Sequence, residues 1–273
     1  MQPTCVEAED VRLRCAVLRE PKAGSSKSEY EDACAVPGDG ASAVTGCTVA
    51  VADGASESML AGAWARMLAR SVSDAAGREL DAAVFAERVC AAAARWPAYV
   101  DRYVRRRERS GRPVAWYEEP KLEQGAYATV LGISFQSESG TVYSGGGAWS
   151  AAALGDSCGF QVRDSQLTAA FPLESAAQFD SSPHLAGTRN PDRDLIELRT
   201  VTRHGNWLPG DVFYLATDAA AQWFLAEDEA DRQPWRQIDE AFDAPGVWLG
   251  ELRAAHRIRN DDVTIVRCLL EPA

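Results

Sequence analysis

Apolar and polar residues alternate in the first patterned segment of the chain. Residues 11–18 (VRLRCAVL) place an apolar side chain at nearly every second position, which is the period of a strand with one buried face. Short apolar runs over residues 32–36 (DACAV) and 47–53 (CTVAVAD), separated by a turn-forming PGDG, predict two more strands. The patterned part of the chain therefore opens with strands.

The hydrophobic period changes after Gly54. An amphipathic helix is predicted there, because apolar residues recur on one helical face. A second helix is predicted over about residues 79–109, and Pro97 is expected to kink or break it, since proline cannot donate the hydrogen bond of a helix interior. The residues on the face of the first helix are Leu60, Trp64, Met67, Leu68 and Ser71.

Strands return in the second half of the chain. A polar stretch without clear period, residues 174–193, is predicted to be a long surface loop or flap. Strands on both sides of a helix pair indicate an α+β fold, and no repeat or linker divides the sequence, so we expect one domain over residues 1–273. The strands predicted here cover residues 128–136, 140–156, 159–167, 195–202, 210–218 and 262–270, with a mixed helical stretch to about residue 255.

The composition is that of a globular protein and argues against several classes of partner. Hydrophobic residues make up 46% and charged residues 25% of the 273 residues, enough for a substantial core. The net charge of −12 disfavours nucleic acids and anionic membranes, which attract basic surfaces. The sequence has no apolar run of membrane-spanning length, no secretory signal pattern and no CxxC pair among its seven cysteines. We therefore expect a soluble, cytoplasmic protein with reduced thiols, and neither nucleic acid nor membrane as partner.

Carboxylates stand where the strongest apolar runs begin or end. Each can be an ordinary turn or cap residue, but strand ends can also converge on one rim of a sheet. Crowded carboxylates repel one another unless cations lie among them, and oxygen ligands favour Mg²⁺ or Mn²⁺ over zinc or copper. Spacing alone leaves both interpretations open, separate turn residues and a metal site. The residues concerned are Glu31, Asp32, Asp53, Asp156, Asp218, Asp261 and Asp262.

The order and wording of these segments resemble the protein phosphatase 2C family, the metal-dependent serine/threonine phosphatases, in their bacterial type. The resemblance spans about residues 11–270. It implies a four-layer α-β-β-α sandwich, with two antiparallel sheets packed face to face, helices on both outer faces and metal ions at one end. The segments that carry it are YEDACAV, VAVADGASES, YATVLGISF, ALGDSCGFQVRDSQL, LPGDVFYLATDAAAQ and RNDDVTIV.

This resemblance implies a ligand set for two Mg²⁺ or Mn²⁺ ions, and for a third in some bacterial members. Asp53 would bridge the two ions. Asp218 and Asp261 would complete the first ion, and Glu31 with the backbone carbonyl of Gly54 would hold the second. For a third ion, the resemblance implies Asp156 together with Asp218.

The implied reaction is hydrolysis of phosphoserine and phosphothreonine. A hydroxide that bridges the two ions would attack the phosphorus without a covalent enzyme intermediate. Asp32 would orient metal-bound water. Lys27 stands where the family has an arginine that grips the substrate phosphate, and lysine lacks the planar fork of arginine.

Three further departures from the family leave the direct ligands in place. Residues 55–58 (ASES) replace a histidine or methionine followed by glycines, so no imidazole is available there as general acid. Ala219 replaces a glycine after Asp218, and Asp262 replaces an asparagine after Asp261. Asp262 would add negative charge near the site unless it points away or caps the turn.

The sequence therefore supports an active phosphoprotein phosphatase that opposes a serine/threonine kinase. Two alternatives remain: a catalytically degenerate domain that binds or regulates a partner, and a hydrolase of small phosphate esters. The arginine-rich segment over residues 101–112 (DRYVRRRERSGR) has two interpretations as well. It is either a solvated helix end or a docking patch for an acidic or phosphorylated partner.

Overall fold

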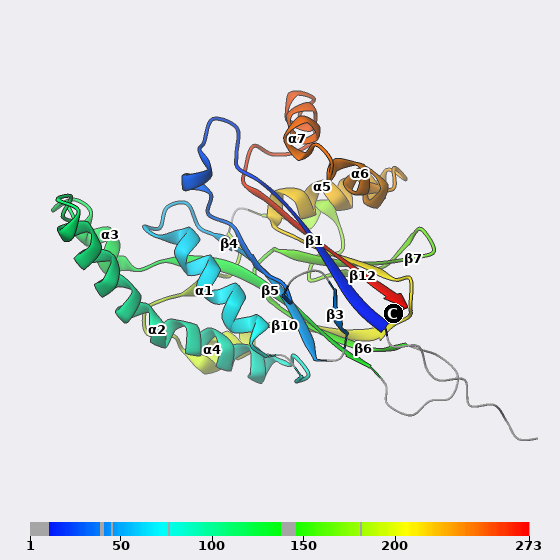
Figure 1. The fold of residues 1–273 in the computed structure, drawn as a ribbon, viewed down its shortest axis with the longest axis horizontal. Coiled ribbons are helices and arrows are strands. Elements are labelled where there is room, and N and C mark those ends of the chain that lie inside the picture. Colours follow the sequence, from blue (N-terminus) through cyan, green and yellow to red (C-terminus); the bar gives the residue numbers. More distant parts are fainter. Residues whose placement is uncertain are drawn as a thin grey trace, which may run out of the picture.

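Two antiparallel sheets form the centre of the protein (Figure 1). The computed structural model describes residues 11–38, 41–44, 46–75, 77–137, 146–180 and 182–272. Sheet A has the order β3 (Ala41–Ala43), β1 (Val11–Glu20), β12 (Val263–Pro272), β11 (Val212–Ala216), β7 (Cys158–Arg163) and β8 (Gln166–Phe171). Sheet B has the order β10 (Val201–Trp207), β6 (Gly147–Leu154), β5 (Tyr127–Ser137), β4 (Cys47–Gly54) and β2 (Ala33–Ala35), and β9 (Ala186–Gly187) pairs with β5.

Helices cover the outer faces of both sheets (Figure 1). The helices on sheet B are α1 (Ala61–Ser73) and α2 (Ala82–Arg109), with α4 (Arg193–Arg199) packed beside α2 and α3 (Glu119–Gln124) beyond its end. Those on sheet A are α5 (Asp218–Glu229), α6 (Pro234–Ala241) and α7 (Pro245–Ala254). The succession helix, sheet, sheet, helix confirms the predicted α+β fold and its four-layer sandwich.

Strand β4 shows how this layering produces a continuous apolar run. Val49 and Val51 belong to the core between the two sheets, whereas Ala50 and Ala52 belong to the core between sheet B and its helices. Successive side chains of a strand point to opposite faces, so a strand covered on both faces is apolar throughout. By the same alternation, Asp53 at the end of β4 falls on the side between the sheets.

Residues 159–167 form a hairpin, not the single strand that the sequence predicted. β7 and β8 are joined by Asp164 and Ser165, whose φ angles of +50° and +58° are those of a tight two-residue turn. The turn contains no glycine, the residue that most often marks such positions. The apolar and polar alternation therefore gave no sign of a break.

The strand predicted over residues 195–202 is also wrong. α4 extends to Arg199, and β10 begins only at Val201. The side chain of Asp192 starts the helix by accepting a hydrogen bond from the Leu195 amide at 3.1 Å. That cap lies in the stretch predicted as a loop, so the pattern gave no reason to expect a helix after it.

Other boundaries agree more closely with the sequence. α2 ends at Arg109, as predicted, and Pro97 lies inside the helix. Of the two expected effects of Pro97, a break is therefore excluded and a kink stays a prediction. Residues 174–180 and 182–192 are irregular apart from a 3₁₀ turn, η2 (Ala176–Gln178), and the short β9, which fits the predicted surface loop. Of the strand predicted over residues 140–156, the part over 140–145 lies outside the described residues. No helix within the described ranges combines the length and apolar character needed to cross a bilayer.

A buried carboxylate ties together the helices on sheet A. Glu227 of α5 is 2% exposed and accepts hydrogen bonds from Arg232 Nε at 2.9 Å and Nη2 at 2.8 Å. Gln237 of α6 and Arg257, which precedes β12, also donate to it. These donors, Arg232 foremost, lower the pKa of Glu227 to about 2. The network therefore supports α5, whose first residue is Asp218.

We predict that Glu227→Gln destabilises the protein by about 3 kcal/mol at pH 7, because the arginines would lose their buried anionic partner. The Glu227 pKa is depressed from 4.5, so its contribution is complete above pH 4.5 and is lost as the pH falls toward 2. Urea unfolding at pH 6 and pH 3 measures the difference, which should shrink at pH 3. Glu240→Gln, at an exposed position of α6, is the control. An equal loss from both substitutions would contradict the prediction.

Candidate active site

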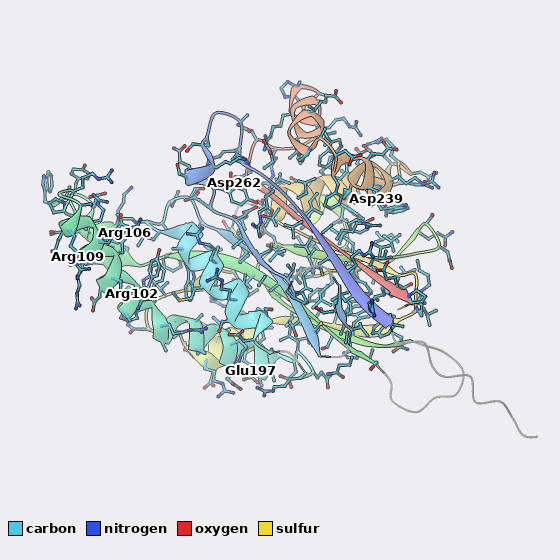
Figure 2. The ribbon with its side chains drawn as sticks, in the orientation of Figure 1. Arg102, Arg106, Arg109, Glu197, Asp239 and Asp262 are labelled. Atoms are coloured by element: carbon cyan, nitrogen blue, oxygen red, sulfur yellow. The ribbon has the colours of Figure 1, made fainter. Side chains whose placement is uncertain are left out.

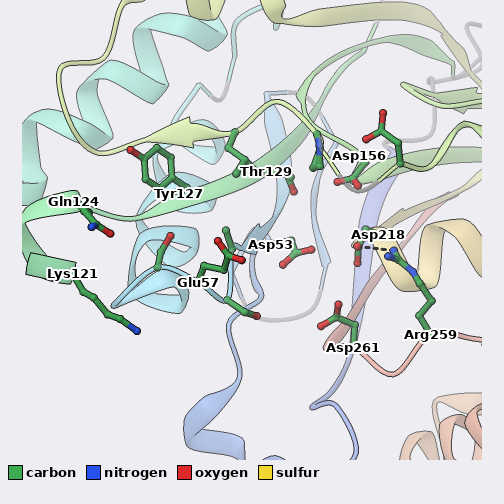
Figure 3. A pocket seen from close by; sticks show the side chains of 18 residues that line it. Asp53, Glu57, Lys121, Gln124, Tyr127, Thr129, Asp156, Asp218, Arg259 and Asp261 are labelled. Atoms are coloured by element: carbon green, nitrogen blue, oxygen red, sulfur yellow. Dashed lines mark hydrogen bonds and ion pairs between the residues drawn. The ribbon is translucent and has the colours of Figure 1, made fainter. Parts of the chain in front are cut away.

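A cavity of about 590 Å³ opens at one end of the sandwich, and Asp53, Asp156, Asp218 and Asp261 line it (Figure 3). Gly54 lies in the same wall. Five of the residues that the sequence singled out thus surround one space. Their proposed roles as ligands stay predictions.

The wall residues come from four separate chain segments. Asp53 is the last residue but one of β4, and Asp156 lies in the turn between β6 and β7. Asp218 is the first residue of α5, one residue after the end of β11, and Asp261 precedes β12. Because β11 and β12 are antiparallel neighbours, the end of one lies beside the start of the other.

Gly54 occupies a position where a side chain does not fit. A Cβ atom there would lie 2.8 Å from the carbonyl carbon of Ala61 and 2.9 Å from the backbone oxygen of Glu31. The end of β4, the start of α1 and the segment before β2 therefore meet at this glycine. The close approach explains why Asp53 is followed by glycine.

Asp53 is the carboxylate most affected by its neighbours. Burial, followed by the nearby charges of Asp32, Asp218 and Asp261, raises the pKa of Asp53 well above its ordinary value. Within the described residues, no lysine or arginine forms an ion pair with it. Figure 3 shows its carboxylate directed into the space that Asp218 and Asp261 also face.

Asp32 is buried beside this group, with 3% of its surface exposed. Its Oδ2 atom accepts hydrogen bonds from Thr217 Oγ1 at 2.8 Å and Thr264 Oγ1 at 3.0 Å. Its Oδ1 atom is buried without a hydrogen-bond partner. Burial raises the pKa of Asp32 to about 7 in spite of the two threonine donors. One oxygen is thus fixed and the other is left to accept a hydrogen bond.

Glu31 lies close to the site but is not part of the cavity wall. Its carboxylate accepts a hydrogen bond from Ser56 Oγ and lies 3.8 Å from Lys22 Nζ. Lys27 is exposed on a 3₁₀ turn, η1 (Lys27–Glu29), and does not line the cavity either. The structure therefore brings neither Glu31 nor Lys27 into the cavity wall, and their roles stay predictions.

Asp262, which departs from the family pattern, has a structural function. Its Oδ1 and Oδ2 atoms accept hydrogen bonds from the backbone amides of Lys22 and Glu31, each at 2.8 Å. Both carboxylate oxygens are therefore satisfied, and the side chain holds the Glu31 segment against the start of β12. The charge of Asp262 still contributes to raising the pKa values of Glu31, Asp32 and Asp261, behind the larger effect of burial.

Arg259 is a site residue that sequence reasoning missed. Its guanidinium lies in the cavity wall and forms an ion pair with Asp218 Oδ2 at 2.6 Å (Figure 3). The Arg259 side chain is 47% exposed, so it can also meet a solute in the cavity. Its place two residues before Asp261 was a signal, because the chain there was already predicted to reach the site.

The carboxylates fit a divalent cation by their chemistry, although they do not form a finished ligand cage. Among the described residues, no group of three or more His, Cys, Asp or Glu side chains has the arrangement of a metal site. The donors are oxygens alone, Asp32 keeps a free oxygen, and burial with the Asp218 charge raises the pKa of Asp156 to about 7. Oxygen donors are the ligands that hard cations prefer. The free Asp32 oxygen and the raised pKa of Asp156 both indicate negative charge that a cation would compensate.

Comparison with known proteins identifies the fold. No protein-family model matches the sequence, and the search of curated proteins finds no match either. Among solved structures, the catalytic domain of the serine/threonine phosphatase PstP in complex with two manganese ions is 17% identical, with a TM-score of 0.56. The match covers 96% of this chain and 99% of that one.

Two other solved structures share the architecture. PppA, a regulatory component of the type VI secretion system in Pseudomonas aeruginosa, is 15% identical over 94% of this chain and 97% of its own, with a TM-score of 0.53. The photosystem II phosphatase PBCP is 15% identical over 96% and 100%, with a TM-score of 0.50. At these identities the matches establish the fold alone.

We predict that the protein without divalent ions loses thermal stability as the pH rises from 5 to 8. The pKa values of Asp32 and Asp156 are raised to about 7, and that of Asp53 is raised well above its ordinary value. Above pH 3.8 the unfolded chain releases these protons while the folded protein still holds them, so the free energy of unfolding falls as the pH rises toward the folded-state pKa values. Asp53→Asn should raise the melting temperature at pH 8 by about 5 °C and change it less at pH 5.

Thermal unfolding in the presence of a chelator measures this effect. Asp243→Asn is the matched control, since Asp243 is exposed between α6 and α7. The predicted repulsion would be refuted if the melting temperature of the wild type did not fall as the pH rises from 5 to 8. It would also be refuted if Asp53→Asn were less stable than the wild type at pH 8.

Proposed function

Because the chain has the protein phosphatase 2C fold, we propose that it is a metal-dependent phosphatase that hydrolyses phosphoserine and phosphothreonine in proteins. The observation that carries the proposal is the crowding of Asp53 against Asp32, Asp218 and Asp261 at the cavity. Such crowding is costly in a protein that never holds cations there, and it is useful in one that does.

In this proposal Asp53, Asp218 and Asp261 hold Mg²⁺ or Mn²⁺ ions together with Glu31 and the Gly54 carbonyl. Asp156 extends the set toward a third ion. When bound, two such ions supply a water molecule activated at neutral pH and positive charge for the phosphoryl oxygens. The two manganese ions of the PstP structure support this choice of cofactor.

The chain's own side chains have separate tasks. Asp32, fixed through Oδ2 by Thr217 and Thr264, accepts a hydrogen bond from water at its free Oδ1 atom and so orients that water. Arg259 binds phosphoryl oxygens from the cavity wall once Asp218 turns to a metal ion. Lys27 remains a second candidate for phosphate binding, from outside the described cavity wall.

The partners follow from the reaction. A phosphoprotein phosphatase reverses the action of a serine/threonine kinase, so we propose such a kinase as the opposing enzyme in the cytoplasm. PppA is a regulatory component of its own system, which supports signalling as the setting.

Two observations favour a second function. Arg259 already neutralises Asp218, and the described residues contain no finished metal cage. Both features suit a catalytically silent domain that binds a partner through the same surface. This alternative requires that added Mn²⁺ or Mg²⁺ produces no turnover.

We predict that the protein hydrolyses a chromogenic aryl phosphate with Mn²⁺ or Mg²⁺ and not with chelator. Asp53→Asn and Asp218→Asn should each lower kcat/KM by more than about a hundredfold, because each removes a proposed ligand. The exposed Asp243→Asn should retain wild-type activity. No turnover from folded wild-type protein in either metal would favour the silent domain.

Phosphopeptides then separate a protein phosphatase from a hydrolase of small esters. A protein phosphatase should process phosphoserine or phosphothreonine peptides with higher kcat/KM than free phosphoserine, because a peptide contacts more of the surface. Equal values for the peptide and the free amino acid would support the small-ester hydrolase.

A further inference from the structure

Two aromatic rings are exposed side by side near the active site. Trp116 is 81% and Tyr117 is 65% exposed, and their rings meet edge to face with centroids 5.9 Å apart. Other tryptophans, such as Trp64 and Trp207, are almost completely buried. Adjacent exposed aromatic rings are unusual in a protein that buries its other tryptophans, and exposed apolar patches of this kind are typical of interaction sites.

The chain holds this pair in place through Arg107 at the end of α2. The Arg107 guanidinium donates to both carboxylate oxygens of Glu118, at 3.3 and 3.0 Å, and to the Arg112 carbonyl at 2.6 Å. Glu118 also accepts from the Ala115 amide at 2.8 Å. The backbone on both sides of the rings is thus fixed, while the rings themselves face solvent. Their exposure is a property of an ordered segment.

The exposed rings are continuous with the active site. Tyr117 lines a smaller cavity of about 260 Å³. The residues that line both this cavity and the cavity of the carboxylates are Ser56, Glu57, Ser58 and Lys121. The two cavities therefore form one groove, which reaches from the carboxylates to Tyr117.

Positive charge gathers at the same end of the molecule. Arg102, Arg105, Arg106 and Arg109 are exposed on the last turns of α2, and Figure 2 shows three of them along that part of the helix. None of the four forms an ion pair with another described residue. The protein as a whole carries a charge of −12. An acidic partner is therefore repelled by the net negative charge of the protein and attracted to the four arginines at the end of α2.

We propose that the Trp116–Tyr117 pair, together with these four arginines, binds the peptide segment that flanks the phosphorylated residue of an acidic phosphoprotein substrate. The aromatic rings pack on an apolar residue of that segment, and the arginines attract its Asp and Glu residues. The inference rests on the proposed function, because it assigns the substrate class of that same site. The phosphoryl group enters the carboxylate cavity while the flanking chain follows the groove.

Three phosphothreonine peptides of equal length test this inference. One carries Asp and Glu before the phosphothreonine, one carries them after it, and the third carries Lys at both sides. Wild-type enzyme should prefer at least one acidic peptide over the lysine peptide by about tenfold in kcat/KM. That preference should weaken with added NaCl, since salt screens exposed charges.

Two double variants identify the surface. Trp116→Ala with Tyr117→Ala, and Arg105→Glu with Arg106→Glu, should each lower kcat/KM for the preferred peptide about tenfold. Both should leave hydrolysis of the aryl phosphate unchanged, because these residues do not touch the phosphoryl group. The matched control is Arg12→Glu with Arg236→Glu, which makes the same charge change at exposed positions of β1 and α6 and should alter neither substrate.

Binding separates a failure of this inference from a failure of the proposed function. Fluorescence anisotropy of the labelled peptides in chelator reports the surface without turnover, and both variants should weaken binding of the preferred acidic peptide. If wild type fails to hydrolyse the aryl phosphate, the proposed function is refuted. The anisotropy measurement still shows whether the acidic peptide binds at the Trp116–Tyr117 pair and the arginines. The inference about the surface would be overturned if both variants left peptide kinetics and binding unchanged. It would also be overturned if a labelled single-stranded RNA bound more tightly than the acidic peptides.

Discussion

Repulsion among carboxylates at one end of the sandwich is the constraint on which the rest of this structure depends. Most of these charges have a local partner. Asp32 accepts from two threonines, Asp218 pairs with Arg259, and Asp262 accepts from two backbone amides. Asp53 forms no ion pair with the described residues and lies among them with a raised pKa. The absence of such a partner for Asp53 in the described part of the chain supports the proposal that divalent cations bind there.

The rest of the fold holds these groups together against their repulsion. Three apolar clusters, one between the sheets and one beneath each helix layer, fix the strands whose ends carry the acids. Gly54 allows β4 to approach α1 closely, and the Glu227 network secures α5 behind Asp218. A site with unfavourable charge persists only where packing elsewhere determines its position. Here that packing is spread over all four layers.

The distribution of charge separates two tasks within one acidic molecule. The cavity concentrates carboxylates and suits cations, whereas the end of α2 concentrates arginines and suits acidic peptides. A groove past Ser58 and Lys121 leads from the cavity to Tyr117, in the segment that follows α2. In the proposed function, selection of a substrate and reaction at phosphorus therefore depend on different residues, so that one can change without loss of the other.

The sequence by itself determined much of the layering. Alternation and helical spacing located most strands and the long helices, and carboxylates at strand ends pointed to one rim. The errors lie where a short local signal decided the structure, as in the Asp164–Ser165 turn and the cap at Asp192. Only the tertiary structure decided which charges meet. It paired Arg259 with Asp218, turned Asp262 to backbone amides, and left Glu31 and Lys27 outside the cavity wall. The physical reason is that hydrophobic periodicity reports only which face of one helix or strand is buried. These contacts join side chains from separate segments, some more than two hundred positions apart in the sequence, and they exist only once the sheets have packed.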